Sequence, residues 1–254
     1  LQDGTKFHGK SFGYDAPVAG EVVFNTAMMG YPESLTDPSY AGQLMVLTYP
    51  LVGNYGVPPF TFEENGLATF MESEKIHASA IIVSDYSENF SHWNAQESLA
   101  EWLKREKVPG ITGIDTRELT KVLREHGVMM GKILFDDMPN EVPEAEYEGV
   151  NFVAKVSCKE VIRYAPTNGE KNAPKVVLVG LFLANGPGDP DTCAVTVGHI
   201  RAFLENPQVR PCMGICMGNQ LLSKAAGATI YKLKYGNRSH NQPVRMVGTN
   251  RCFI

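Results

Sequence analysis

Apolar residues in the first third of the chain occur in short alternating runs separated by Gly and Pro. Residues 20–26 (Gly-Glu-Val-Val-Phe-Asn-Thr) and 43–50 (Gln-Leu-Met-Val-Leu-Thr-Tyr-Pro) are the clearest examples. Alternation with a period of two, bounded by turn residues, predicts short β-strands. Residues 77–83 form a more continuous apolar run, which predicts a further and more buried strand.

The pattern then changes to a helical period. Leu99, Trp102 and Leu103 recur at helical spacing among charged residues, which predicts a helix from Ala95 to about Lys104. The N-terminal part of the chain is therefore expected to combine strands with helices.

A second helix is predicted to begin after Asp115. Asp115 and Glu118 have the N-cap and N3 spacing of a capping box, and Leu119 and Leu123 share one face. Gly127 can end this helix. With these two helices, the first domain is predicted to be a mixed α+β structure.

Residues 164–175 are polar, contain two prolines, and are predicted to be a linker. The apolar run Val176–Val179 follows and resembles the first buried strand of a parallel α/β sheet. Residues 180–185 also have the pattern of a strand, yet neighbouring parallel strands need a crossover of a dozen or more residues. Either 176–185 is one long strand, or a segment is missing between Val179 and Gly180. We favour the missing segment.

Composition narrows the function classes. The chain has 254 residues, a formal net charge of −5 and scattered basic residues, which gives no electrostatic footprint for nucleic acid or an anionic membrane surface. It has no apolar run of about 18 residues that would predict a membrane span, and no signal-peptide pattern at its start. A cytoplasmic protein acting on a small substrate is expected.

The five cysteines do not have the spacing of a metal site. Cys212 and Cys216 lie four residues apart without a second pair or a histidine tract to complete a zinc set, so no metal site is predicted. Reduced thiols are expected, and any reactive cysteine would owe its reactivity to its local setting.

Cys216 has such a setting. It lies at the centre of Gly-Ile-Cys-Met-Gly, between a short apolar strand pattern and a helical pattern that ends at Gly227. A Gly-x-Cys-x-Gly turn from strand to helix is the sulfur version of a nucleophile elbow, which exposes the nucleophile at a helix N-terminus where thiolate is favoured. Taken alone, the motif would fit a buried structural cysteine equally well.

A second loop changes that balance. Residues 185–190 (Asn-Gly-Pro-Gly-Asp-Pro) follow a strand pattern, and their glycines allow a backbone N–H to point at a substrate oxygen. Together with the amide of Met217, this N–H would complete an oxyanion hole.

The two motifs together resemble the class I glutamine amidotransferases, whose elbow usually reads Gly-Ile-Cys-x-Gly-His-Gln. Further segments resemble the small subunit, or fused glutaminase region, of glutamine-dependent carbamoyl-phosphate synthetase. Their sequence is most similar to that of the eukaryotic pyrimidine-pathway enzymes. These segments are residues 37–40, 47–56, 113–117 and 235–243. The resemblance covers nearly the whole chain.

The resemblance implies an α/β protein with two domains. The small-subunit N-terminal domain would cover 1–163, the linker 164–175, and a parallel-sheet amidotransferase domain 176–254. That second domain is expected to be incomplete, with a gap after Val179 and a missing C-terminal part.

The resemblance also assigns roles to individual residues. Cys216 would be the nucleophile, and the amides of Gly186 and Met217 would form the oxyanion hole. The substrate glutamine would contact three further residues, which are Ser39, Gly188 and Gln220. Without the resemblance, Ser39 in its Asp-Pro-Ser turn would be taken as a structural residue.

The expected activity is hydrolysis of glutamine to glutamate and ammonia through a cysteine thioester. The ammonia would serve a carbamoyl-phosphate synthetase large subunit, or a fused synthetase domain, for pyrimidine or arginine synthesis. No ATP motif is found in this chain, so ATP and Mg²⁺ are expected only in that partner, and no cofactor is expected here.

This sequence departs from the family pattern in two ways. Asn219 stands where most relatives have His, which affects local packing more than the reaction. In addition, the family's catalytic His-Pro-Glu motif lies far beyond the elbow, and none of the six histidines here is a convincing substitute. A longer natural chain is therefore expected.

Two other functions are compatible with parts of the sequence. A cysteine hydrolase of the α/β-hydrolase type shares the elbow, but it does not account for residues 1–150. A non-catalytic regulatory or docking module of the same complex would keep the fold without hydrolysing glutamine. The presence of Cys216 and Gln220 argues against that module.

Overall fold

The computed structural model describes residues 1–254 except 65, 140, 143–146, 148, 164–179, 207–210, 239–241 and 254. The chain forms two compact units. The first comprises Leu1–Phe60, Phe70–Tyr147 and Leu233–Ile254, and the second comprises Thr61–Thr69 and Glu148–Lys232. The domain boundaries expected from the sequence, 1–163 and 176–254, stay a prediction.

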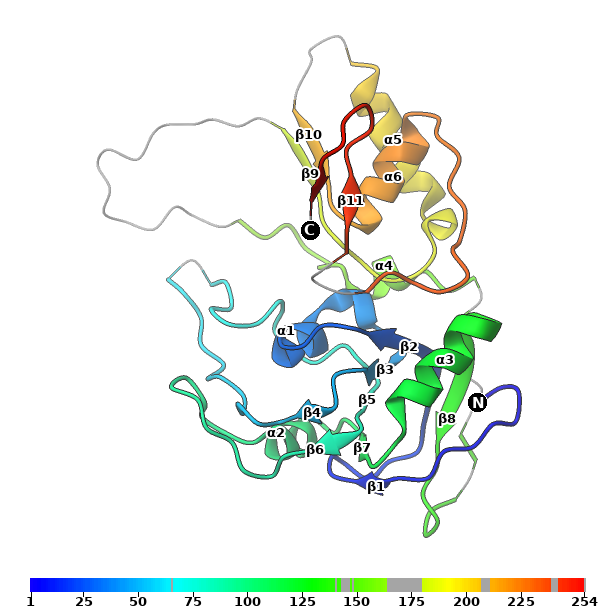
Figure 1. Cartoon of the computed structure of the whole chain (residues 1–254). Coiled ribbons are helices and arrows are strands. Elements are labelled where there is room, and N and C mark those ends of the chain that lie inside the picture. The colour runs from blue at the N-terminus through cyan, green and yellow to red at the C-terminus, as the bar shows by residue number, and fades with distance from the viewer. Residues whose placement is uncertain are drawn as a thin grey trace. The chain divides into compact units, whose positions relative to one another are not determined.

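A six-stranded mixed sheet forms the centre of the first unit (Figure 1). Four inner strands run parallel, and an antiparallel strand lies at each edge. The strand order is β1 (Lys10–Ser11), β7 (Gly110–Thr112), β5 (Ala80–Ile82), β3 (Gln43–Leu47), β2 (Val18–Asn25) and β8 (Met129–Ile133). The strands predicted within 20–26, 43–50 and 77–83 are confirmed.

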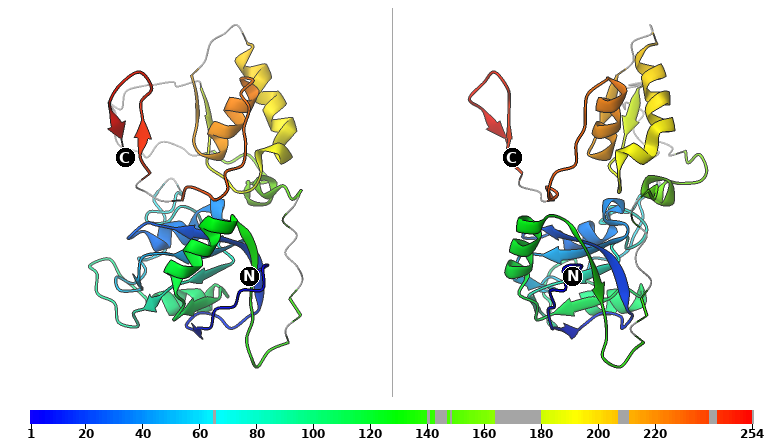
Figure 2. Two further views of the ribbon diagram at one scale, coloured as in Figure 1. Left: turned by 45° about the vertical axis from the view of Figure 1, so that its right-hand side comes forward. Right: turned by 90° about the vertical axis from the view of Figure 1, so that its right-hand side faces the viewer.

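The two faces of this sheet are covered by different helices. One face is covered by α3 (Thr116–His126), as Figures 1 and 2 show. Val22, Leu44 and Val46 of the sheet share a hydrophobic cluster with Leu119 and Leu123 of this helix. The opposite face lies against α2 (Leu99–Arg105), since a Cβ added at Gly110 would lie 2.9 Å from Leu103 Cδ1. The mixed α and β character of this unit is confirmed.

The helix predicted to follow Asp115 has the expected N-cap residue and the expected glycine after its last turn. Asp115 Oδ1 accepts a hydrogen bond of 2.8 Å from Glu118 N, and Gly127 follows the helix with φ 96°. α2 begins at Leu99 and not at Ala95, because Ser98 forms a complete capping box with Glu101. Glu97, the residue before that cap, forms an antiparallel β-bridge with Val57 and is therefore extended.

The remaining elements of the first unit are short. They include two helical turns that the apolar pattern did not predict, α1 (Tyr31–Thr36) and the 3₁₀ turn η1 (Pro38–Tyr40). Two small strand pairs complete it, β4 (Leu51–Val52) with β6 (Asp85–Tyr86), and β11 (Val244–Arg245) with β12 (Cys252–Phe253).

The second unit contains a two-stranded parallel sheet packed against helices (Figure 2). Its elements are α4 (Phe152–Val156), β9 (Leu181–Leu183), η2 (Pro190–Cys193), α5 (Ala194–Leu204), β10 (Cys212–Gly214) and α6 (Met217–Ala225). Val197, Ile200, Met217 and Leu221 of the two long helices form its core. In the described part of the chain, no helix is long and apolar enough to cross a membrane.

The parallel strand expected beside β9 from Val176–Val179 lies outside the described residues. Among the described strands, the neighbour of β9 is β10, with Leu181 opposite Cys212 and Leu183 opposite Gly214.

Candidate active site

Cys216 occupies a strained position between a strand and a helix. β10 ends at Gly214, and α6 begins at Met217, so that Cys216 is the N-cap residue. Its backbone has φ 50° and ψ −112°, a conformation that L-residues rarely adopt, and its side chain is exposed. Such strain is characteristic of functional sites, and it is the geometry that the sequence motif predicts for a nucleophile elbow.

Two glycines make this turn sterically possible. A Cβ at Gly218 would lie 2.1 Å from the carbonyl oxygen of Leu183, and a Cβ at Gly214 would lie 2.5 Å from the carbonyl oxygen of Gly218. Both distances are far below van der Waals contact with backbone atoms that cannot easily move. The spacing of glycine on both sides of Cys216 therefore has a direct structural reason.

Backbone hydrogen bonds hold the turn against β9. Ile215 N donates to Leu183 O at 2.9 Å, and Gly218 N donates to Ala184 O at 3.1 Å and to Ile215 O at 2.8 Å. The Met217 amide, in contrast, has no hydrogen-bond acceptor among the residues that the structure describes. It belongs to the first turn of α6, whose N–H groups favour a negatively charged ligand.

The second loop lies beside the first. The position of a Cβ at Gly186 is 3.7 Å from both Cβ and Cγ of Met217, so the two residues predicted to form the oxyanion hole are neighbours. Gly188, with φ 87°, lies against Phe152 of α4. The structure thus brings Gly186 next to Met217 from a loop about thirty residues before the elbow, while Gly188 of the same loop contacts α4.

Side chains fix this loop at several points. The Asp189 carboxylate caps η2 by accepting from Asp191 N at 2.8 Å, and Lys224 of α6 forms an ion pair with Asp191. Asn151, the N-cap of α4, donates to Thr192 O at 3.1 Å. The loop that carries Gly186 is therefore anchored to both α4 and α6.

Gln220 lies one turn into α6 and is half-buried. Its backbone N–H donates to Cys216 O at 3.0 Å, so Gln220 lies one helical turn after Cys216. This placement agrees with a side chain that contacts a substrate bound at Cys216, and the contact itself stays a prediction.

Ser39 lies in the first unit, in η1. It is half-exposed, and its amide donates to Asp37 Oδ1 at 2.8 Å. Ser39 and Cys216 belong to different units, each of which is described by itself. The predicted contact between Ser39 and glutamine therefore stays a prediction.

The described residues contain no cluster of three His, Cys, Asp or Glu side chains that would bind a metal ion. The second unit contains one histidine in its described part, His199 on the exposed surface of α5, and its ring forms no hydrogen bond with Cys216 among the described residues.

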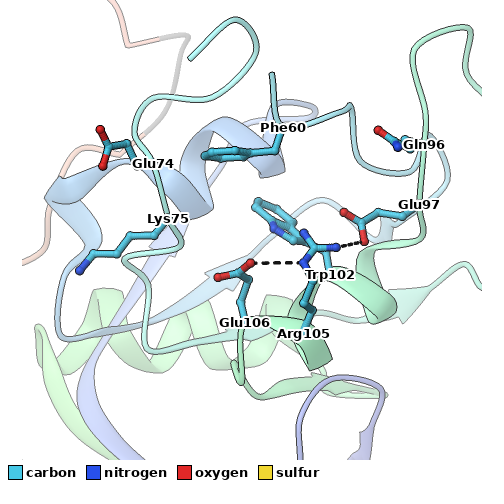
Figure 3. Close-up of a pocket in the computed structure, with 8 residues that line it drawn as sticks. All are labelled: Phe60, Glu74, Lys75, Gln96, Glu97, Trp102, Arg105 and Glu106. Carbon is cyan, nitrogen blue, oxygen red and sulfur yellow. Dashed lines mark hydrogen bonds and ion pairs between the residues drawn. The ribbon is translucent and has the colours of Figure 1, made fainter. Parts of the chain in front are cut away.

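A cavity of about 550 Å³ lies elsewhere, in the first unit, and none of the predicted site residues lines it (Figure 3). Arg105 lies between Glu97 and Glu106 on one wall, and its hydrogen bond to Glu97 raises the pKa of the guanidinium. This guanidinium is thus paired with two carboxylates, and the cavity is lined by no cysteine.

Comparison with known proteins agrees with this geometry. The model of the carbamoyl-phosphate synthase small chain, CPSase domain, matches residues 1–133, and the model of the class I glutamine amidotransferases matches residues 134–254. The arginine-specific small chain of carbamoyl phosphate synthase from Saccharomyces cerevisiae is 41% identical over all of this chain and 71% of its own length. The chain belongs to the carbamoyl-phosphate synthase small-chain family.

Other family members are similar to the same degree. The multifunctional protein CAD of Squalus acanthias is 43% identical, and multifunctional protein pyr1-3 of Dictyostelium discoideum is 42% identical, each over the whole chain. This chain spans only 13% and 14% of the length of those two relatives. It is thus similar to both separate small chains and large multifunctional proteins.

The alignment with the Squalus protein runs over 284 positions, although this chain has 254 residues. The relative therefore carries additional residues within the matched stretch. This difference is compatible with the predicted omission between Val179 and Gly180, which stays a prediction.

The sequence did not predict which residues pack against the elbow. Leu183 and Ala184 accept hydrogen bonds from Ile215 and Gly218, and the carbonyl of Leu183 is what excludes a side chain at position 218. The signal was present in part, since 180–185 reads as a strand that leads into the Gly-Pro-Gly loop.

Proposed function

We propose that this chain is the glutamine-hydrolysing part of a carbamoyl-phosphate synthase, with Cys216 as the nucleophile. The observation that carries this proposal is the strained conformation of Cys216, with φ 50°, at the exposed N-terminus of α6. A structural cysteine has no need of such strain, whereas a nucleophile elbow does. Family membership supplies the substrate class.

The reaction would proceed through a covalent intermediate. The thiolate of Cys216 attacks the carboxamide carbon of glutamine, and the electron pair of the C=O bond moves to oxygen. The amides of Gly186 and Met217 stabilise that oxyanion, in keeping with the closeness of the two residues. The C–N bond then breaks, and ammonia leaves with a proton from the family's catalytic histidine.

A second half-reaction completes the cycle. Water adds to the thioester carbon, the same oxyanion site stabilises the new tetrahedral intermediate, and the bond from carbon to Sγ of Cys216 breaks to release glutamate. Gln220, one turn above Cys216, and Gly188 would hold the substrate in place. Ser39 would bind its α-amino or α-carboxylate end.

The ammonia would be used elsewhere. We propose that it passes to a synthetase partner, either a separate large subunit or a fused domain, which combines it with bicarbonate and ATP in the presence of Mg²⁺. The similarity to multifunctional protein CAD and to arginine-specific small chains is compatible with either pyrimidine or arginine synthesis. Residues 1–133, which match the small-chain model, argue against a cysteine hydrolase of the α/β-hydrolase type.

The test compares two nitrogen sources in the complete enzyme. Replacing Ser39 with alanine removes a hydrogen bond to a charged group of glutamine, which costs about 1.5–3 kcal/mol. We expect a loss of roughly ten- to hundred-fold in kcat/KM for glutamine. Carbamoyl-phosphate synthesis from free ammonia should hardly change, because ammonia bypasses the glutamine site.

Steady-state kinetics of the Ser39→Ala enzyme with each nitrogen source measures both values. Equal losses with glutamine and ammonia would mean that Ser39 supports the fold or an interface. Unchanged use of glutamine would remove Ser39 from the substrate site.

A further inference from the structure

A short segment near the C-terminal end of the chain lies along the sheet of the first unit. Val128 N donates to Lys234 O at 3.1 Å, and Thr26 N donates to Arg238 O at 3.2 Å. Between these two bonds, the ring of Tyr235 lies 5.8 Å from that of Phe24 in β2. The segment 234–238 is thus attached to the sheet by backbone hydrogen bonds at both ends.

The side chain of Arg238 reaches into a buried polar network. Its Nη2 donates to Gln43 Oε1 at 3.3 Å, and its guanidinium carbon lies 5.9 Å from the centre of the Tyr40 ring. A planar guanidinium can donate hydrogen bonds at its edge while it stacks on an aromatic face, which an ammonium group cannot do in the same way.

Gln43, which accepts from Arg238, also donates two hydrogen bonds through its side chain. Gln43 is only 2% exposed, and its Nε2 donates to Glu21 Oε2 at 2.7 Å and to the Tyr147 hydroxyl at 3.0 Å. Burial, with the nearby charge of Glu21, raises the pKa of Tyr147, so this hydroxyl stays protonated. The orientation of the Gln43 amide is therefore fixed, and so is the direction from which Oε1 accepts.

Tyr40 links this network to Ser39. The two residues are consecutive in the three-residue turn η1. The Tyr40 hydroxyl accepts from Asn25 Nδ2 at 3.0 Å, and Asn25 is 1% exposed. The ring is held at its hydroxyl by Asn25 and over its face by Arg238, so it cannot move without moving the turn that carries Ser39.

We propose that Arg238 is a positioning residue for glutamine, which sets the place of the Ser39 hydroxyl through the Tyr40 ring. The inference rests on the proposed contact between Ser39 and glutamine. It also gives the two matched regions a physical connection, since Arg238 lies within the stretch matched by the amidotransferase model and Tyr40 within that matched by the small-chain model. A shift of about 1 Å in a positioning group is enough to lower an enzymatic rate by about a hundred-fold.

The test is a double-mutant cycle in the complete enzyme. Arg238→Met keeps most of the aliphatic stem but removes the guanidinium, and we expect KM for glutamine to rise about ten-fold while ammonia-dependent synthesis stays unchanged. Arg238→Lys keeps the charge without the planar group and should recover only part of this loss. Once Ser39→Ala is present, adding Arg238→Met should reduce glutamine use little further, because both changes act on the same hydroxyl.

Arg124→Met is the matched control. Arg124 also stacks on an aromatic ring of the segment 234–238, with its guanidinium carbon 5.7 Å from the centre of the Tyr235 ring, but it is exposed and makes no contact with Tyr40 among the described interactions. We expect the KM of the Arg124→Met enzyme for glutamine to stay within about two-fold of wild type, since loss of a surface side chain away from the network should matter little.

The outcomes separate this inference from the proposed function. Suppose first that Ser39→Ala impairs glutamine use as expected. The inference alone is then overturned if Arg238→Met has no effect, if the losses of the two variants are fully additive, or if Arg238→Met impairs synthesis from glutamine and from ammonia equally. An inert Ser39→Ala overturns the substrate contact and the inference with it.

Discussion

Replacing Cys216 with serine is expected to reduce glutamine-dependent carbamoyl-phosphate synthesis by on the order of 10⁴-fold or more, as removal of a catalytic nucleophile does. Serine preserves the size of the side chain, so the strained backbone at φ 50° should persist. Its hydroxyl is a far weaker nucleophile at neutral pH than a thiolate. Synthesis from free ammonia should remain close to wild type, because it needs no glutamine hydrolysis.

Cys212→Ser provides the matched control, since Cys212 lies four residues earlier within β10 and away from the elbow. It should retain glutamine use within about two-fold, the usual range for a tolerated substitution. Substantial glutamine hydrolysis by the Cys216→Ser enzyme would mean that another residue, and not Cys216, is the nucleophile. The alternative of a regulatory or docking module is favoured instead if the wild-type enzyme uses only free ammonia and Cys216→Ser changes nothing.

Gly218→Ala should cause the next largest loss. The new Cβ would lie 2.1 Å from the carbonyl oxygen of Leu183 and 2.5 Å from its carbonyl carbon, so β9 and α6 must separate. That movement would displace Cys216 and the Met217 amide together and break the hydrogen bond of 3.1 Å from Gly218 N to Ala184 O. We expect a loss of roughly a hundred-fold or more in kcat/KM for glutamine, with ammonia use retained.

Gly198→Ala is the control for glycine replacement. Gly198 lies inside α5, and a Cβ there would meet no atom within 4 Å. Alanine is the better helix former by about 1 kcal/mol, so the variant should be active and slightly more stable in thermal unfolding. Normal glutamine use by Gly218→Ala would show that close contact with Leu183 is not required for the site.

The elbow could be predicted from sequence because its cause is local. Glycine at 214 and 218, a preceding apolar strand and a following helical pattern together determine a strand–turn–helix with a strained residue at its centre. The same holds for the N-cap of α3, where the Asp115 side chain lies three residues from its partner. Local rules of this kind need no knowledge of the rest of the fold.

Other features depend on residues that are far apart in the sequence. The hydrogen bond from Arg238 to Gln43 joins residues 195 positions apart, and no periodicity indicates it. The closeness of Gly186 to Met217 likewise follows from the parallel pairing of β9 with β10. α1 was missed because six residues with a proline in the first turn are too few for a helical period. Ser39 was singled out by the family resemblance alone.

The central claim is that glutamine hydrolysis passes through a thioester on Cys216. Rapid acid quench of the complete enzyme during turnover of labelled glutamine, followed by peptide mapping, measures this intermediate directly. We predict a hydroxylamine-sensitive glutamyl label on the peptide that contains Cys216, and none on that peptide in the Cys216→Ser enzyme. A glutamyl label on a peptide containing Cys158, Cys193 or Cys252 in its place would contradict it.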